Sequence, residues 1–309
     1  MKSSVRDRII RRLPLQRRLE KAIRVPELVD HATVTGSAWG ICIAKNEADI
    51  IDHTVRHFLN QGFDGLIVVD NGSTDGTLDM LRHLAATDSH LFVGTDLEPA
   101  FFQGRKMSYL AHLAWRAGAE WIVPFDADEQ WFAVGATVPE FLRATDAEVV
   151  ECAMFNVFPA RGDDALDLSQ ARTLRLETRP TGWVKVAFRA RPWVWVRNGN
   201  HEVRSHGTRT SGLRLRHFQY RSLEQISRKV GPGRDAVEQA FGRSSGFSTH
   251  WRDLDLLPVA ALEAAWSEHI QGEKRIEGTG ELSLATINLS EPWSTWDPAG
   301  ELAKGRGAS

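Results

Sequence analysis

Three carboxylates directly follow an apolar run in the middle of the chain, in the stretch WIVPFDADEQW at residues 121–131. Asp126, Asp128 and Glu129 offer hard oxygen donors, and two aspartates one residue apart suit Mg²⁺ or Mn²⁺, which commonly sits on phosphate as well. The apolar run predicts a buried strand, whose carboxyl end in a parallel α/β sheet opens on the ligand crevice. The alternative is an acidic loop after a core strand. This stretch alone leaves both interpretations open.

The composition is that of a globular protein with a sizeable core. The 309 residues are 42% hydrophobic and 25% charged, which leaves room for one large domain or two modest ones. The net charge of -2 gives no general affinity for nucleic acid. Cys42 and Cys152 lie in apolar runs and are expected to be reduced core thiols. Since no apolar run is long enough to cross a membrane, we expect a cytoplasmic protein.

The first 24 residues are strongly basic. Nine lysines and arginines stand against Asp7 and Glu20, and Pro14 is expected to interrupt any helix. One interpretation is peripheral contact with anionic lipid at the inner face of a membrane. The other is a solvated leader, followed by a linker at residues 25–37.

Strands and helices alternate from Trp39 onwards. Apolar runs predict strands at residues 39–44, 66–69, 91–93 and 121–125. Apolar residues at helical spacing predict helices at 51–59, 78–85 and 107–117 between them. Such a series requires right-handed crossovers and a largely parallel sheet. Asp70 and Asp126 end two of these strands, where parallel sheets bind nucleotides.

The pattern changes after residue 131. Strands are predicted at 148–158, 173–176, 184–190, 193–196 and 213–220, with a short helix at 139–143. A helix from Ser222 is expected to stop at Gly231-Pro232-Gly233, and another is expected at 235–241.

Four motifs, in this order, resemble those of the family 2-like glycosyltransferases of GT-A fold. They are Ala44-Lys45-Asn46-Glu47, the run VDNGSTDGT at residues 69–77, Gln103-Gly104-Arg105-Lys106, and Asp126-Ala127-Asp128-Glu129. The resemblance is to the branch with a KNE opening and a DxDE acidic motif. It covers roughly residues 38–230, including Lys185, His201 and residues 216–222. A single DxD is a weak signal, but four motifs in order on the expected elements are a strong one.

The resemblance implies an α/β fold with a mainly parallel central sheet, a smaller mixed acceptor-side region and a helical C-terminus. It divides the chain into a leader and linker (1–37), a glycosyltransferase domain (38–230) and an extension (231–309). Within the domain, residues 38–131 would bind nucleotide and 132–230 the acceptor. The implied activity is hexosyl transfer from a UDP- or GDP-linked donor to a glycan or lipid-linked acceptor, with Mn²⁺ or Mg²⁺.

The resemblance also assigns roles to residues. Those expected to bind the nucleotide sugar are Ala44, Lys45, Glu47, Asp70, Asn71, Arg105, Lys106 and Asp126. Asp70 would contact the base, Asp126 the ribose or the metal, and Asp128 would be the metal ligand. Asp75 is expected only to cap its turn.

The catalytic base is less closely defined. Inverting enzymes of this fold use a carboxylate on the acceptor side to take the hydroxyl proton. The family usually supplies it from a Glu-Asp or similar pair well after the acidic motif, and this sequence has no such pair there. Glu202, beside His201, is the candidate, with Glu151 and Asp163 as alternatives. His201 is expected to act with Glu202 in catalysis or to complete the metal site. His217 could also complete the metal site, but inside an alternating strand it is expected to be a hydrogen-bonded structural histidine.

Other classes of protein fit less well. A nucleotidyltransferase would carry a glycine-rich basic loop after the first strand, where this chain has Lys45-Asn46-Glu47. A phosphatase of the DxD type would carry its motif after the first strand rather than the fourth. A non-catalytic sugar- or nucleotide-binding protein on the same fold remains the main alternative, since fold alone does not determine function.

Overall fold

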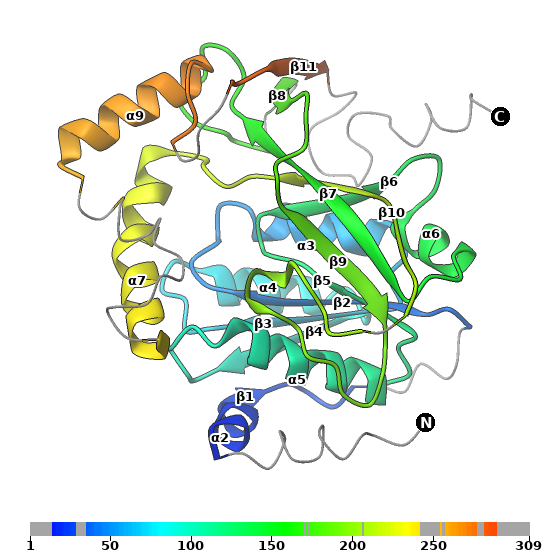
Figure 1. Ribbon diagram of the computed structural model, residues 1–309. Coiled ribbons are helices and arrows are strands. Elements are labelled where there is room, and N and C mark those ends of the chain that lie inside the picture. Colours follow the sequence, from blue (N-terminus) through cyan, green and yellow to red (C-terminus); the bar gives the residue numbers. More distant parts are fainter. Residues whose placement is uncertain are drawn as a thin grey trace.

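A parallel sheet forms the first half of the fold. The computed structural model describes residues 14–28, 35–169, 171, 173–205, 207–241, 254, 257–276 and 281–288. Within it, β2 (Ala38–Ala44), β3 (Gly65–Asp70), β4 (Leu91–Asp96) and β5 (Trp121–Pro124) lie in the order β4-β3-β2-β5 and run parallel. Figure 1 shows them beside the helices α3 (Ile51–Asn60), α4 (Thr77–Ala85) and α5 (Gln103–Arg116).

Both faces of this half are buried because successive side chains on each strand enter different cores. Cys42 and Val68 pack in one apolar cluster with residues of α3 and α4. Their neighbours Ile41 and Ile67 pack in a second cluster with residues of α5. Strands buried on both faces need continuous apolar sequence, which explains why the apolar runs located these strands.

The second half of the sheet is mixed. It continues in the order β5-β9-β7-β10-β6 through β9 (Val184–Arg189), β7 (Val149–Phe158), β10 (Arg209–His217) and β6 (Glu129–Ala133). β10 is parallel to β7 but antiparallel to β6. α6 (Val138–Ala144) follows β6, and β8 (Thr173–Glu177) pairs with the end of β7. The prediction of an α/β fold with a mainly parallel sheet and a mixed region is confirmed.

The structure differs from the sequence predictions at three places after residue 124. The strand predicted at 193–196 is absent except for an isolated bridge between Val196 and Val203. α7 (Leu223–Phe241) runs through Pro232 instead of stopping, because Ile226, Val230 and Val237 keep the same apolar face buried on both sides of it. β6 was not predicted.

The described part of the basic leader packs on the edge of the sheet. Pro14 begins α2 (Pro14–Ala22) instead of interrupting a helix, since a proline in the first turn removes no helical hydrogen bond. β1 (Ile23–Arg24) then pairs antiparallel with β4. Leu19 and Ile23 are buried. The predicted lipid contact of residues 1–13 lies outside the described residues, in which no helix is long and apolar enough to cross a membrane.

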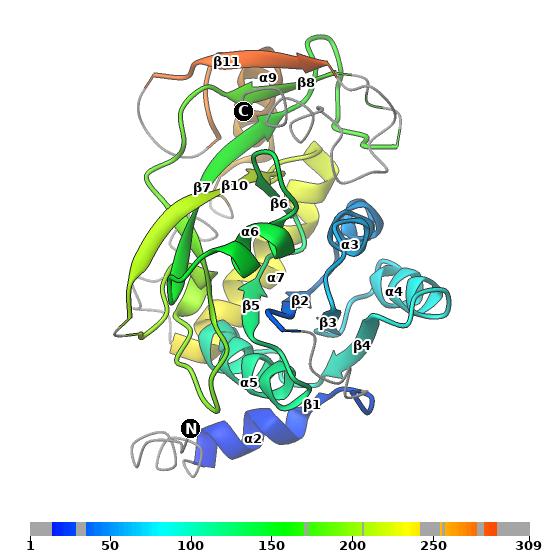
Figure 2. The same ribbon diagram turned by 90° about the vertical axis from the view of Figure 1, so that its right-hand side faces the viewer.

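The described C-terminal residues lie at the end of the molecule opposite to α2, as Figure 2 shows. α9 (Val259–Gln271) packs on α7 through Trp266, and β11 (Leu284–Asn288) pairs antiparallel with β8. Arg175 of β8 donates to the carbonyl oxygen of Gln271 at 3.0 Å, which ties the end of α9 to this ribbon.

His269 on α9 gives this region a pH-dependent contribution to stability. Burial lowers its pKa to about 4, and the charge of Arg175 adds to the effect. Since the unfolded chain binds a proton near pH 6.5 and the folded chain only near pH 4, stability falls as the pH drops through this window. We expect His269→Phe to reduce that loss by about 2 kcal/mol between pH 7 and pH 4.5.

Urea unfolding at pH 7 and pH 4.5 measures this difference. His90→Asn is the control, because His90 is half-exposed. Equal acid sensitivity of His269→Phe and the unaltered protein would contradict the assignment.

Candidate active site

The turns after β2 and β3 are joined into one structure. The backbone N–H of Asn46 donates to Ser73 Oγ at 2.9 Å, and Asn46 Oδ1 accepts from the N–H of Thr74 at 2.8 Å. The N–H of Glu47 donates to Thr77 Oγ1 at 2.9 Å. The first two motifs therefore form one surface at the carboxyl ends of the strands.

Asp70 lies buried at the end of β3 with one oxygen unused. Its Oδ2 accepts from the N–H groups of Gly72 at 3.0 Å and Ser73 at 3.1 Å. Its Oδ1 is buried and has no hydrogen-bond partner among the described residues. A buried acceptor without a partner is unfavourable, so this oxygen is suited to an N–H of a ligand.

Asn71 and Lys106 both face the end of β4. Asn71 Nδ2 donates to Asp96 Oδ2 at 2.9 Å, and Lys106 Nζ pairs with the same oxygen at 2.6 Å. Burial lowers the pKa of Lys106, although the charge of Asp96 acts in the opposite direction. Arg105 lies 5.1 Å from the Trp195 ring centroid. These three predicted donor-site residues therefore support the neighbouring loops.

Asp126 is surrounded by N–H donors. Its Oδ1 accepts from Gln103 Nε2 at 2.9 Å and from Asn200 Nδ2 at 3.1 Å, while Oδ2 lies 2.5 Å from Lys185 Nζ. Lys185 also pairs with Glu129 at 2.8 Å. Burial raises the pKa of Glu129 to about 8, and the negative charge of Asp126 adds to the effect, although Lys185 acts in the opposite direction.

Asp128 belongs to a different cluster, which includes Arg221 and Lys229. Its Oδ2 lies 3.8 Å from Arg221 Nη1 and 3.8 Å from Lys229 Nζ. Glu47 bridges these two cations, at 2.7 Å from Arg221 Nη2 and 2.5 Å from Lys229 Nζ. Burial acts to raise the pKa of Asp128, but Lys229 and His217 outweigh it and the net shift is downward.

The register between β10 and β6 brings His217 to Asp128. His217 is the partner of Glu129 in the ladder, and the N–H of Phe218 donates to the carbonyl oxygen of Asp128 at 2.8 Å. His217 Nε2 lies 3.9 Å from Asp128 Oδ1. Burial lowers the pKa of His217 to about 4, so the imidazole is neutral at pH 7.

A neutral imidazole facing an ionised carboxylate fits a divalent metal. Two metal–ligand bonds of about 2.1 Å each can span their separation. No group of three or more histidine, cysteine or acidic side chains suited to a metal occurs in the described part of the chain. A metal held by Asp128 and His217 would therefore take its remaining ligands from a bound diphosphate and water.

His201 and Glu202 lie elsewhere. His201 Nδ1 is 2.8 Å from the carbonyl oxygen of Val184, and its ring contacts the exposed indole of Trp183. Burial lowers its pKa, and the charge of Lys185 lowers it further. Glu202 is half-exposed and pairs with Arg197 at 3.0 Å. The histidine beside Asp128 is thus His217, and His201 lies on the Lys185 side.

The alternative bases are also on the surface. Glu151 of β7 lies 3.5 Å from Arg209, and Asp163 is exposed. No role was predicted from the sequence for Lys229 or Asn200. Asn200 stood beside the predicted His201, which could have drawn attention to it, whereas nothing in the local pattern marked Lys229.

Acids at the carboxyl ends of the parallel strands β3 and β5 lie where α/β proteins commonly bind nucleotides. The family model described as Glycosyl transferase family 2 matches residues 41–192. This match lies within the part of the chain that carries the four motifs, and it is to the family that those motifs resemble. No curated protein matches the chain at a significant level.

Several solved structures are similar at low identity. TarS from S. aureus is 13% identical with a TM-score of 0.36; the match covers 73% of this chain and 50% of that one. This chain thus spans half the length of that relative. PcManGT from Pyrobaculum calidifontis, a mannosyltransferase in complex with GDP-Man and Mn²⁺, is 17% identical with a TM-score of 0.37, covering 83% and 77% of the two chains.

Proposed function

We propose that the protein transfers a hexose from a UDP- or GDP-linked donor to a hydroxyl group of an acceptor, with Mn²⁺ or Mg²⁺. The observation that carries this proposal is the approach of Asp128 to the neutral His217, beside two cations. The unpartnered oxygen of Asp70 at a neighbouring strand end supports it, because a nucleobase N–H could be bound there.

The donor would lie across the strand ends. Asp70 would accept from the base, and the turn of Ala44, Lys45 and Glu47 would line the pocket. Asp126, held by its three donors, would face the ribose. Asp128 and His217 would hold the metal, which when bound neutralises charge on the departing diphosphate. Lys229 lies close enough to Asp128 to add positive charge there.

The acceptor hydroxyl needs a proton acceptor, and we assign this role to His201. Its Nδ1 faces a carbonyl oxygen and therefore donates, which leaves Nε2 with a free lone pair in the neutral ring. Glu202 is the alternative. A displacement assisted in this way would invert the anomeric centre. The acceptor class we propose is a cell-surface glycan or glycolipid, which the basic residues 1–24 would help to reach.

A thermal-shift experiment with nucleotides tests the donor site. We expect UDP or GDP with Mn²⁺ to raise the melting temperature, because a ligand at 100 times its Kd stabilises the native state by about 2.7 kcal/mol. ATP with Mn²⁺ serves as the control nucleotide. An equal rise without metal would refute metal dependence. Binding without release of nucleotide from any sugar donor would favour the non-catalytic alternative.

A further inference from the structure

A chain of side-chain contacts leads from the C-terminal segment to His217. We propose that Arg275, Glu177 and Asn156 are positioning residues, which hold the imidazole of His217 in the tautomer whose Nε2 lone pair faces Asp128. The consequence for metal binding rests on the proposed function, whereas the tautomer itself does not.

The first link determines which groups donate. Arg275 Nε donates to Glu177 Oε1 at 2.6 Å, and the Glu177 side chain is only 3% exposed. A carboxylate paired with arginine can only accept hydrogen bonds. Any neighbour of Glu177 must therefore turn a donor towards it.

Asn156 lies between Glu177 and His217, so its orientation decides which nitrogen of His217 carries the proton. Its Nδ2 donates to Glu177 Oε2 at 3.3 Å, which turns its Oδ1 towards His217 Nδ1 at 3.0 Å. Because Oδ1 can only accept, Nδ1 must carry the imidazole proton. A neutral imidazole has one N–H, so Nε2, which lies 3.9 Å from Asp128 Oδ1, has a lone pair.

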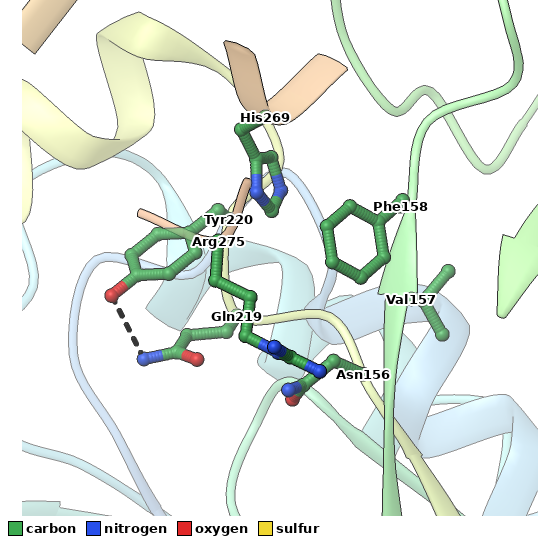
Figure 3. Close-up of a pocket in the computed structure, with 7 residues that line it drawn as sticks. All are labelled: Asn156, Val157, Phe158, Gln219, Tyr220, His269 and Arg275. Atoms are coloured by element: carbon green, nitrogen blue, oxygen red, sulfur yellow. Dashed lines mark hydrogen bonds between the residues drawn. The ribbon is translucent and has the colours of Figure 1, made fainter. Parts of the chain in front are cut away.

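The contacts join parts of the chain that are distant in sequence. Asn156 lies on β7, Glu177 on β8 and His217 on β10, while Arg275 follows α9. Figure 3 shows Asn156 and Arg275 among the residues that line a cavity bounded also by His269 and Tyr220. The segment after α9 would thus act on the active site indirectly. Arg275 contacts Glu177, and the effect reaches His217 through Asn156.

Glu177→Gln tests this directly, because the change preserves shape but introduces a donor. The glutamine amide can donate to Asn156 Oδ1, so the asparagine amide is free to turn its NH₂ group towards His217. That orientation favours the tautomer with the proton on Nε2, which points an N–H at Asp128 and removes the metal-binding lone pair.

Nitrogen-15 NMR of histidine-labelled, metal-free full-length protein reads the tautomer, with the His217 signals identified by their loss in His217→Gln. We expect a single Nδ1–H tautomer in the unaltered protein and in Arg275→Lys. We expect its loss in Glu177→Gln, Asn156→Leu and Arg275→Leu. Lys274→Leu is the matched control, because the neighbouring Lys274 pairs with Glu268 instead.

Mn²⁺ binding in the presence of UDP, followed by electron paramagnetic resonance, gives the second readout. We expect a loss of affinity of about 10- to 100-fold in Glu177→Gln. An unchanged tautomer in both Glu177→Gln and Asn156→Leu would overturn the proposal. If the tautomer changes as expected but the unaltered protein binds no Mn²⁺, the positioning role stands and the proposed metal-dependent function fails.

Discussion

Replacing Asp128 with asparagine is expected to reduce donor turnover by about 10²–10³-fold while the protein keeps its fold. The substitution preserves the size of the side chain but removes the charge that Asp128 presents beside His217. Since its pKa lies below the ordinary value, this carboxylate is ionised at pH 7. The measurement is release of UDP or GDP from a panel of nucleotide sugars with Mn²⁺, together with circular dichroism.

A matched substitution on the surface shows whether the loss of turnover comes from the position of Asp128 or merely from removing one negative charge. Asp79 is 86% exposed on α4 and pairs only loosely with Arg82, at 3.6 Å. Asp79→Asn should therefore leave turnover unchanged. If Asp128→Asn retained full turnover in a folded protein, Asp128 would have no place in the metal site.

Arg221→Met is expected to destabilise the protein by about 3–5 kcal/mol. Arg221 is 1% exposed and donates to Glu47 at 2.7 Å, Asp49 at 2.7 Å and the carbonyl oxygen of Phe218 at 2.8 Å. Methionine fills similar space but leaves these acceptors without their cation. The urea midpoint, with its slope held constant, measures the change.

Arg143→Met provides the control for this experiment. Arg143 also pairs with a carboxylate, Asp64 at 2.9 Å, but its side chain is 34% exposed. Its loss should change stability by about 0–1 kcal/mol. Equal effects of the two substitutions would show that the buried cluster is not held together by Arg221.

The loss of stability caused by Arg221→Met should also be smaller at acid pH than at pH 7. Burial acts to raise the pKa of Asp49, but hydrogen bonding and charge from Arg221 produce a net lowering. A carboxylate of lowered pKa contributes stability above its unfolded value near 3.8, and that contribution is lost as the pH falls further. Unfolding at pH 7 and pH 3 gives the comparison.

The sequence predicted the parallel half well because its strands are apolar on both faces. β6 was not predicted because it begins with two polar residues, Glu129 and Gln130. Both are buried in the structure, but their sequence does not form an apolar run. The continuation of α7 through Pro232 depends on tertiary packing, which local helix signals do not report.

The site was predicted in part for a related reason. Asp70, Asp126 and Asp128 follow apolar runs and could be recognised locally. The pairing of Asp128 with His217 depends on the register between β6 and β10, which join segments far apart in sequence. Sequence spacing could not distinguish His217 from His201, and the isolated Lys229 carried no motif.

The pairing of β1 with β4 has a practical consequence for handling the protein. A truncation at residue 25 would remove the whole basic segment, but it would also remove β1 and uncover the backbone N–H and C=O groups of β4. An open sheet edge promotes association between molecules. A shortened protein that begins at residue 14 would retain α2 and β1 and keep this edge covered.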